Sequence, residues 1–147
     1  MKKLFLLTAV LTASCGLPPL IITIEDDVRE NHALIEAEII EALDFFCAKR
    51  SVDCHVLQED MEIVVKEEYF VNGVECGGNY TYPMNRVIIT HSGGPGHNAL
   101  FHELLHAEAI HTSNRKLHHN NPAAAEEFSS IFNNLREEWR CRNEEKN

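Results

Sequence analysis

The stretch His102-Glu103-Leu104-Leu105-His106 decides the fold expected for this chain. Four residues separate its two histidines, so on a helix both imidazoles project from one face, one turn apart, and can share a tetrahedral zinc ion. The apolar residues Leu100 and Phe101 just before it predict that the same helix also packs into a core. We expect this helix to run to about His111, with Asn98 as its N-cap.

Glu103 supplies the carboxylate that zinc-dependent hydrolysis requires. It is adjacent to the histidine face and can reach a zinc-bound water, whose pKa the metal lowers to about 7. The carboxylate would take a proton from this water as it attacks a carbonyl, and would return the proton to the leaving amine. The pattern predicts one zinc ion on His102 and His106, with Glu103 as the catalytic base.

A catalytic zinc site needs a third protein ligand, and Glu126 is the favoured candidate. It follows His106 by twenty residues, at the start of the last predicted helix. The run Glu126-Glu127-Phe128-Ser129-Ser130-Ile131-Phe132-Asn133 is similar to the Glu-x-x-Ala-Asn/Asp-x-Phe-Ala pattern of compact gluzincins such as the ImmA/IrrE-type peptidases. This resemblance covers roughly residues 86–135. It implies a zincin-like fold, zinc ligands His102, His106 and Glu126, and Glu103 as catalytic base.

Other third ligands stay open. Glu127 is one alternative, because it lies nearer the apolar stripe of the same helix. His118 and His119 follow His106 by a spacing similar to that in SprT-like zincins, whose third ligand is a histidine. Those proteins act on DNA-associated targets inside cells, which suits an acidic, exported chain poorly, but His119 remains an alternative. At about 100° per residue, His111 points away from the zinc face, and we expect it on the surface near the helix end.

Two further helices are expected. Residues 26–50 have apolar side chains at helical spacing, acids at the start and Lys49-Arg50 at the end. Asn121-Pro122 starts the last helix with an N-cap and a proline at the first helical position. Its apolar stripe consists of Phe128, Ile131, Phe132, Leu135 and Trp139.

The remaining apolar runs predict a small mixed sheet. Strands are expected at residues 52–57, 61–71 and 86–90, with a tight turn at Asn72-Gly73. The strand at 86–90 is expected to form the edge beside the cleft, where an extended peptide can add as another strand. Donors that could stabilise an oxyanion near the metal are Tyr80, Tyr82, His91 and His97.

The N-terminus has the layout of an export signal: a basic start, a short apolar run and small residues. Residues 11–16 resemble a bacterial lipobox, and this favours lipidation at Cys15 over an ordinary secretory signal. We expect a signal peptide at 1–15, a tether at 16–25 that ends in a short extended segment, and a catalytic domain at 26–147. The protein would then be a membrane-anchored lipoprotein of a bacterial envelope, facing the periplasm or the cell surface, or otherwise a secreted protein.

The cysteine content and the net charge further restrict the class of protein to which the chain can belong. Without Cys15, four cysteines remain in an exported chain, so two disulfides are plausible, although the spacing does not give the pairing. These are Cys47, Cys54, Cys76 and Cys141. A formal charge of −10 argues against a nucleic-acid binder.

The sequence therefore predicts an α+β, zincin-like zinc metallopeptidase that acts on a peptide or protein substrate. One alternative is a lipoprotein that holds zinc on His102, His106 and neighbouring histidines without turnover. Another is an anchored interaction module whose site has decayed and binds no metal.

Overall fold

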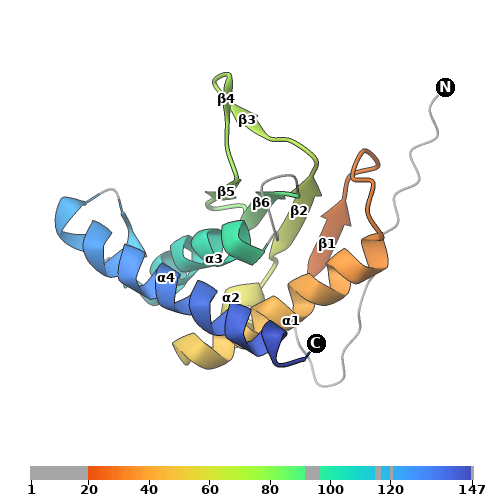
Figure 1. The fold of residues 1–147 in the computed structure, drawn as a ribbon. Helices are drawn as coiled ribbons and strands as arrows, with labels where there is room; N and C mark the ends of the chain where they lie inside the picture. Colours follow the sequence, from red (N-terminus) through yellow and green to blue (C-terminus); the bar gives the residue numbers. More distant parts are fainter. Residues whose placement is uncertain (1–19, 92–96, 115–116, 120, 147) are drawn as a thin grey trace.

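The computed structural model describes residues 20–91, 97–114, 117–119 and 121–146 (Figure 1). This part of the chain is mixed α+β, as predicted. Its helices are α1 (His32–Arg50), α2 (Cys54–Gln58), α3 (His97–Thr112) and α4 (Pro122–Glu144). Its strands are β1 (Ile21–Ile24), β2 (Glu62–Lys66), β3 (Phe70–Val71), β4 (Val74–Glu75), β5 (Gly78–Thr81) and β6 (Arg86–Thr90).

Strands β1, β2, β6 and β5 lie side by side in that order in one sheet. The first three are parallel, whereas β5 runs antiparallel to β6. The prediction that strand 86–90 forms the sheet edge is wrong, because β6 pairs on both sides. Strand β5 takes the edge position, since the turn before β6 reverses the chain through Asn85, whose φ of 44° lies in the left-handed region that asparagine tolerates.

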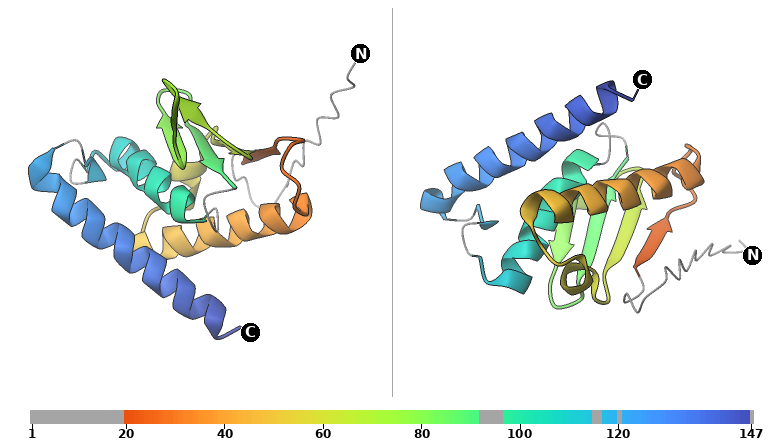
Figure 2. Two further views of the ribbon diagram at one scale, coloured as in Figure 1. Left: turned by 45° about the horizontal axis from the view of Figure 1, so that its top comes forward. Right: turned by 90° about the horizontal axis from the view of Figure 1, so that it is seen from below.

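Helices α1 and α3 cover one face of this sheet, and α4 lies against both helices (Figure 2). Phe45, Phe101 and Trp139, one from each helix, meet with ring centroids 5.2 to 5.8 Å apart. All three side chains are buried, and such aromatic contacts add to the free energy gained by burial. Helix α3 is therefore fixed between the sheet and α4.

Helix α1 begins later than expected. Residues 26–31 lie outside it, because the side chain of Asn31 accepts a hydrogen bond from the backbone N–H of Ala33 and so caps the helix there. The acidic residues that were expected to open the helix therefore belong to the preceding loop.

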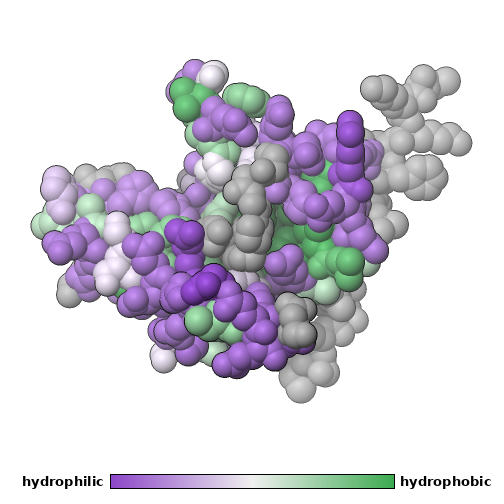
Figure 3. Space-filling view, viewed as in Figure 1, coloured by the Kyte–Doolittle hydropathy of each residue, from purple (hydrophilic) through white to green (hydrophobic). Residues whose placement is uncertain are grey.

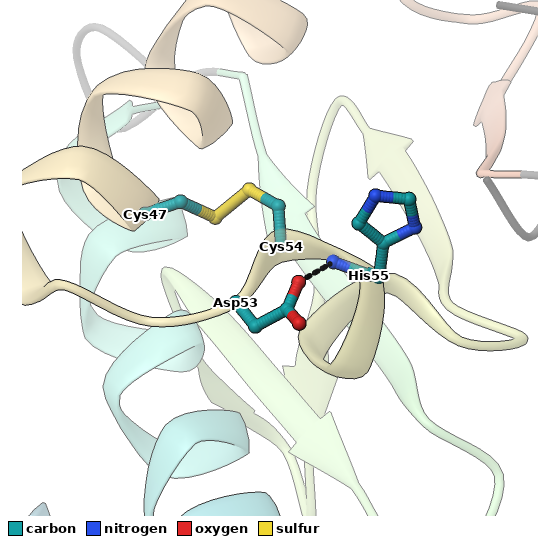
Figure 4. Close-up of a disulfide and its surroundings, with 4 residues drawn as sticks. All are labelled: Cys47, Asp53, Cys54 and His55. Carbon is teal, nitrogen blue, oxygen red and sulfur yellow. Dashed lines mark hydrogen bonds between the residues drawn. A yellow bond between two sulfur atoms is a disulfide. The ribbon is translucent and has the colours of Figure 1, made fainter. Parts of the chain in front are cut away.

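The strand predicted at 52–57 is wrong, since this segment contains helix α2. Asp53 caps the helix by accepting a hydrogen bond from His55 N–H at 2.9 Å (Figure 4). A disulfide joins Cys47, near the end of α1, to Cys54 at the start of α2. The local cap and this cross-link outweigh the strand preference of Val52 and Val56.

The segment at 61–71 is divided between two strands. Strand β2 ends at Lys66 because its partner β6 ends opposite, at Thr90. Strands β3 and β4 then form a separate hairpin, and Asn72-Gly73 makes the predicted tight turn with φ values of 52° and 79°.

The two C-terminal helices follow the predictions closely. Helix α3 begins at His97, so Asn98 lies in its first turn and is not its cap. Asn121 caps α4 and accepts a hydrogen bond from Ala123 N–H. In the predicted stripe of α4, Phe128, Leu135 and Trp139 are buried, and Ile131 and Phe132 are partly buried.

The predicted signal peptide with Cys15 lies outside the described residues. Within the segment expected to be a tether, Ile21–Ile24 forms β1 and pairs with β2, so the expected short extended segment belongs to the sheet. No helix in the described ranges is long and apolar enough to cross a bilayer.

A buried ion pair ties α1 to the outer side of α3. Arg50 donates from Nε and from a terminal guanidinium nitrogen to the two carboxylate oxygens of Glu108, each at 2.9 Å. The Glu108 side chain is only 5% exposed and that of Arg50 20%. This pairing gives the acidic residue two positions after His106 a cation partner away from the histidines.

Removal of one partner should destabilise the fold strongly. We expect Arg50→Ala to lower the free energy of unfolding by about 3–5 kcal/mol, because it leaves the Glu108 carboxylate buried without its cation. The double variant Arg50→Met/Glu108→Leu should recover most of this loss, since it buries neither charge. Urea denaturation followed by circular dichroism measures both. If the single variant has the same free energy of unfolding as the wild type, the ion pair does not stabilise the packing of α1 against α3.

Candidate metal centre

Three histidines converge beside helix α3. His102 and His106 lie one turn apart on α3, and His119 reaches them from the connection between α3 and α4. One ring nitrogen from each lies within 4.8 Å of the others, and this is the one such group of potential ligands in the described part of the chain. The Nε2 atoms of His106 and His119 are 3.1 Å apart. The structure thus brings His119, one of the alternatives for the third ligand, next to the two favoured histidines.

Phe128 of α4 packs against all three imidazoles. Its ring centroid lies 4.9 Å from that of His102, 5.3 Å from that of His106 and 5.0 Å from that of His119. Phe132, one turn further along α4, adds a contact of 5.6 Å to His102. These apolar contacts restrict the rotation of the imidazoles and shield one side of the group from water.

This set of donors suits a zinc ion. Zinc binds neutral imidazole, and tetrahedral coordination at about 2.0–2.1 Å needs ligand nitrogens roughly 3.3 Å apart, close to the separation of the Nε2 atoms of His106 and His119. Burial and the neighbouring histidines lower the pKa of His106 to about 4 and also lower the pKa of His102. Both rings are therefore neutral at pH 7 and ready to ligate.

Glu103 lies beside the histidines and against strand β5. The side chain is buried, and this burial raises the pKa of its carboxyl to about 7, although a hydrogen bond from the backbone N–H of Tyr80 opposes the rise. The carboxyl can therefore both accept and donate a proton near neutral pH.

Gly78 makes room for this carboxylate. A Cβ atom built on Gly78 would lie 3.0 Å from Glu103 Oε1, 3.1 Å from Glu103 Cγ and 2.9 Å from the carbonyl oxygen of Ile88. The adjacent Gly77 differs, because a Cβ there would meet only Ala99 Cβ, at 4.0 Å. Strand β5 and helix α3 can approach this closely only with glycine at position 78.

The group opens into a cleft of about 410 Å³ between α3, β5 and the connection before α4. This volume is typical of a ligand-binding site. Its lining consists of Gly78, Asn79, Tyr80, Tyr82, His102, Glu103, His106, Ile110, His118 and His119.

A buried asparagine that the sequence did not single out organises the far end of this cleft. Asn85 Oδ1 accepts a hydrogen bond from the Tyr80 hydroxyl at 3.1 Å and lies 3.4 Å from His111 Nε2. Its Nδ2 donates to the carbonyl oxygens of Leu57 and Glu59.

Burial, together with Tyr82, raises the pKa of Tyr80 to about 12. The Tyr80 hydroxyl thus holds β5 in place. An asparagine directly before a strand was the only signal in the sequence.

The other predicted site residues lie apart from the metal group. Glu126 is exposed, and because it precedes Phe128 by two residues, or about 200° around α4, it points away from the histidines. Glu127 is also exposed and outside the group. His111 is partly buried beside Asn85. This arrangement favours His119 over Glu126 as the third ligand.

Only some of the candidate oxyanion donors lie at the cleft. His91 Nε2 lies 2.9 Å from Glu30 Oε1, and the side chain of His97 is outside the described structure. Tyr80 and Tyr82 line the cleft, but the Tyr80 hydroxyl donates its hydrogen bond to Asn85.

No protein-family model, curated protein or solved structure matches this chain. A function must therefore be argued from the chemistry of the cleft. Three clustered imidazoles next to a carboxyl with a pKa near 7 form a site that can hold a metal ion and transfer a proton.

The buried carboxyl should make the metal-free protein sensitive to pH. Because folding raises the pKa of Glu103 from 4.5 to about 7, its contribution to stability is fully present below pH 4.5 and is lost as the pH rises through 7. Relative to Glu103→Gln, the wild type should therefore lose about 3 kcal/mol of unfolding free energy between pH 4.5 and 8. Urea titrations of both proteins with a chelator measure this difference. A constant difference across this range would contradict the raised pKa.

Proposed function

We propose that the protein is a zinc-dependent peptidase with a zincin-like fold, in which His102, His106 and His119 hold one zinc ion and Glu103 is the catalytic base. The observation that carries this proposal is the buried Glu103 carboxyl, with its pKa raised to about 7, beside three clustered imidazoles in an open cleft. A buried carboxyl without a cation partner is costly, and such groups concentrate at functional sites.

The residues of the cleft divide the chemical work. When bound, zinc supplies a Lewis acid that polarises a carbonyl and makes water a nucleophile near neutral pH. Glu103 takes the proton of the attacking water and delivers it to the leaving amine, and a pKa near 7 suits both transfers. The backbone N–H of Tyr80 orients the carboxylate. Phe128 holds the imidazoles in place and keeps water away from one side of them.

Strand β5 supports a polypeptide substrate. Thr90 N–H donates to Gly77 carbonyl oxygen, so residues 77, 79 and 81 direct their backbone groups to β6, while those of Gly78 and Tyr80 point to the opposite side. Among the described strands only β6 pairs with β5. Because the Tyr80 N–H already binds Glu103, an extended peptide would pair with the backbone of Gly78 and the Tyr80 carbonyl oxygen, and would lie along the cleft beside Glu103.

Export of the protein is part of the same proposal. A disulfide such as Cys47–Cys54 persists in an oxidising compartment, and this agrees with an exported lipoprotein anchored through Cys15. Cys76 and Cys141 are free thiols in the described structure. One of the two expected disulfides, Cys47–Cys54, is therefore present there.

A non-catalytic zinc-binding lipoprotein is the second candidate. His118 lines the cleft, and its ring centroid lies 5.8 Å from that of His106. If His118 also bound the ion, four protein ligands would close the site and leave no position for water, as in structural zinc sites. This candidate predicts zinc without hydrolysis.

Zinc content tests the proposed ligand set. We expect the purified mature protein to hold one zinc ion by elemental analysis, His119→Ala to lose most of it after dialysis, and Glu126→Ala to keep it. Glu126 is a matched control because it is exposed and lies in the first turns of α4, just after the connection that carries His119. Loss of zinc only with Glu126→Ala would restore the gluzincin ligand set, and no zinc in the wild type would leave the decayed interaction module.

Hydrolysis separates the peptidase from the zinc-binding lipoprotein. With fluorescein-labelled casein as substrate, Glu103→Gln should keep its zinc and lose activity. Gly78→Ala should also keep zinc but lose about 100-fold in kcat, because its Cβ displaces the Glu103 carboxylate and a misplacement of about 1 Å costs this much. Gly77→Ala, whose Cβ has room, should cleave at the wild-type rate. Zinc-loaded wild type that cleaves nothing would exclude the peptidase.

A further inference from the structure

The hairpin formed by β3 and β4 exposes apolar side chains at the end of the cleft strand. Phe70 is 54% exposed, Val71 39% and Val74 65%. Figure 3 shows apolar residues gathered on this hairpin, which projects from the rest of the molecule (Figure 1). Side chains of this kind cost free energy in water, and a cluster of them often marks a binding surface.

The hairpin is attached directly to the cleft. Strand β4 leads into β5 through residues 76 and 77. Cys76 N–H donates to the Tyr69 carbonyl oxygen, which joins the two arms of the hairpin at its base. Thr90 N–H donates to the Gly77 carbonyl oxygen, so the arm that leads into β5 is held at the sheet. Gly77 faces Ala99 in the first turns of α3, whereas Gly78 faces Glu103. The hairpin therefore lies beyond one end of the cleft and is joined to edge strand β5 through a bend at Gly77.

The distance along the strand gives the position of a ligand. Val74 precedes Gly78 by four residues, which span at most about 13 Å, the length of a fully extended chain at 3.3 Å per residue. A peptide paired with β5, with its cleaved bond beside Glu103, would reach the hairpin three or four residues from that bond. The occupant is thus a part of the substrate itself.

The charges around the hairpin favour a peptide over a membrane surface. Glu68 and Glu75, which flank the apolar residues, are exposed, and the whole chain carries a formal charge of −10. Anionic lipid headgroups would be repelled, whereas a peptide with a basic residue next to an apolar one would be attracted.

We propose that the β3–β4 hairpin is a substrate subsite that binds an apolar side chain three or four residues from the cleaved bond, with a preference for a neighbouring Lys or Arg. The subsite rests on the proposed peptidase function. It would select unfolded or extended segments, because a folded substrate cannot present five or more residues in line along β5.

Cleavage of a random peptide library by the zinc-loaded protein tests this subsite. Mass spectrometry of the products should show enrichment of Leu, Ile, Val or Phe at the third or fourth position on one side of the bond. In Phe70→Ser/Val74→Ser the enrichment should vanish, and kcat/KM for a ten-residue peptide carrying that residue should fall about tenfold. A five-residue peptide that ends before the hairpin should be cleaved at the wild-type rate.

Leu34→Ser is the matched control, since Leu34 is 69% exposed on α1, away from the cleft lining. It should leave the enrichment and both rates unchanged.

An unchanged enrichment in Phe70→Ser/Val74→Ser would overturn the subsite while leaving the peptidase intact. The double variant could instead abolish dimers seen in sedimentation without altering peptide preference, and this result would assign the hairpin to a second copy of the chain. Loss of binding to phosphatidylcholine vesicles, again with unaltered peptide preference, would assign it to lipid. Failure of zinc-loaded wild type to cleave any peptide would remove the peptidase and the subsite together.

Discussion

The close approach of strand β5 to helix α3 is the constraint on which the rest of the site depends. Only a residue without a side chain fits at Gly78, where the Glu103 carboxylate and the Ile88 carbonyl oxygen both crowd the backbone. This contact buries the carboxyl, raises its pKa and gives it the Tyr80 N–H as a partner. It also leaves the backbone groups of Gly78 and the Tyr80 carbonyl oxygen directed away from β6. The hydrogen bonds of Asn85 hold the far end of the strand, so the approach does not rest on one residue alone.

Helix α4 imposes the second constraint, from the opposite side of the histidines. Its N-cap at Asn121 fixes where the helix begins, and Phe128, two turns in, then lies against three imidazoles at once. An apolar side chain in this position leaves the third imidazole of the group to the short connection that precedes the helix. His119 occupies that connection, next to His106.

The sequence was most informative where the chemistry is local. The spacing of His102 and His106 fixes their common face through helix geometry alone, and the Asn72-Gly73 turn and the cap at Asn121 are equally local. The third ligand depends on how α4 rotates against α3. The apolar stripe through Phe128 indicates that rotation, whereas a resemblance in residue order favoured Glu126. The edge position of β5 and the short helix α2 escaped prediction because they follow from strand pairing and a disulfide, which no periodicity encodes.

The two faces of α3 have different roles, one in the cleft and the other in the packing of the helices. Toward the cleft it presents His102, Glu103 and His106, whose burial costs free energy when no metal is bound, because a carboxyl and several polar rings are withdrawn from water. Toward α1 and α4 it presents Phe101 within the aromatic cluster and Glu108 in its pair with Arg50. Glu108 follows His106 by two residues, about 200° around the helix, so its charge is neutralised away from the metal group. An acidic residue at this position is therefore compatible with the proposed zinc site, since it anchors the outer face of the helix that carries the ligands.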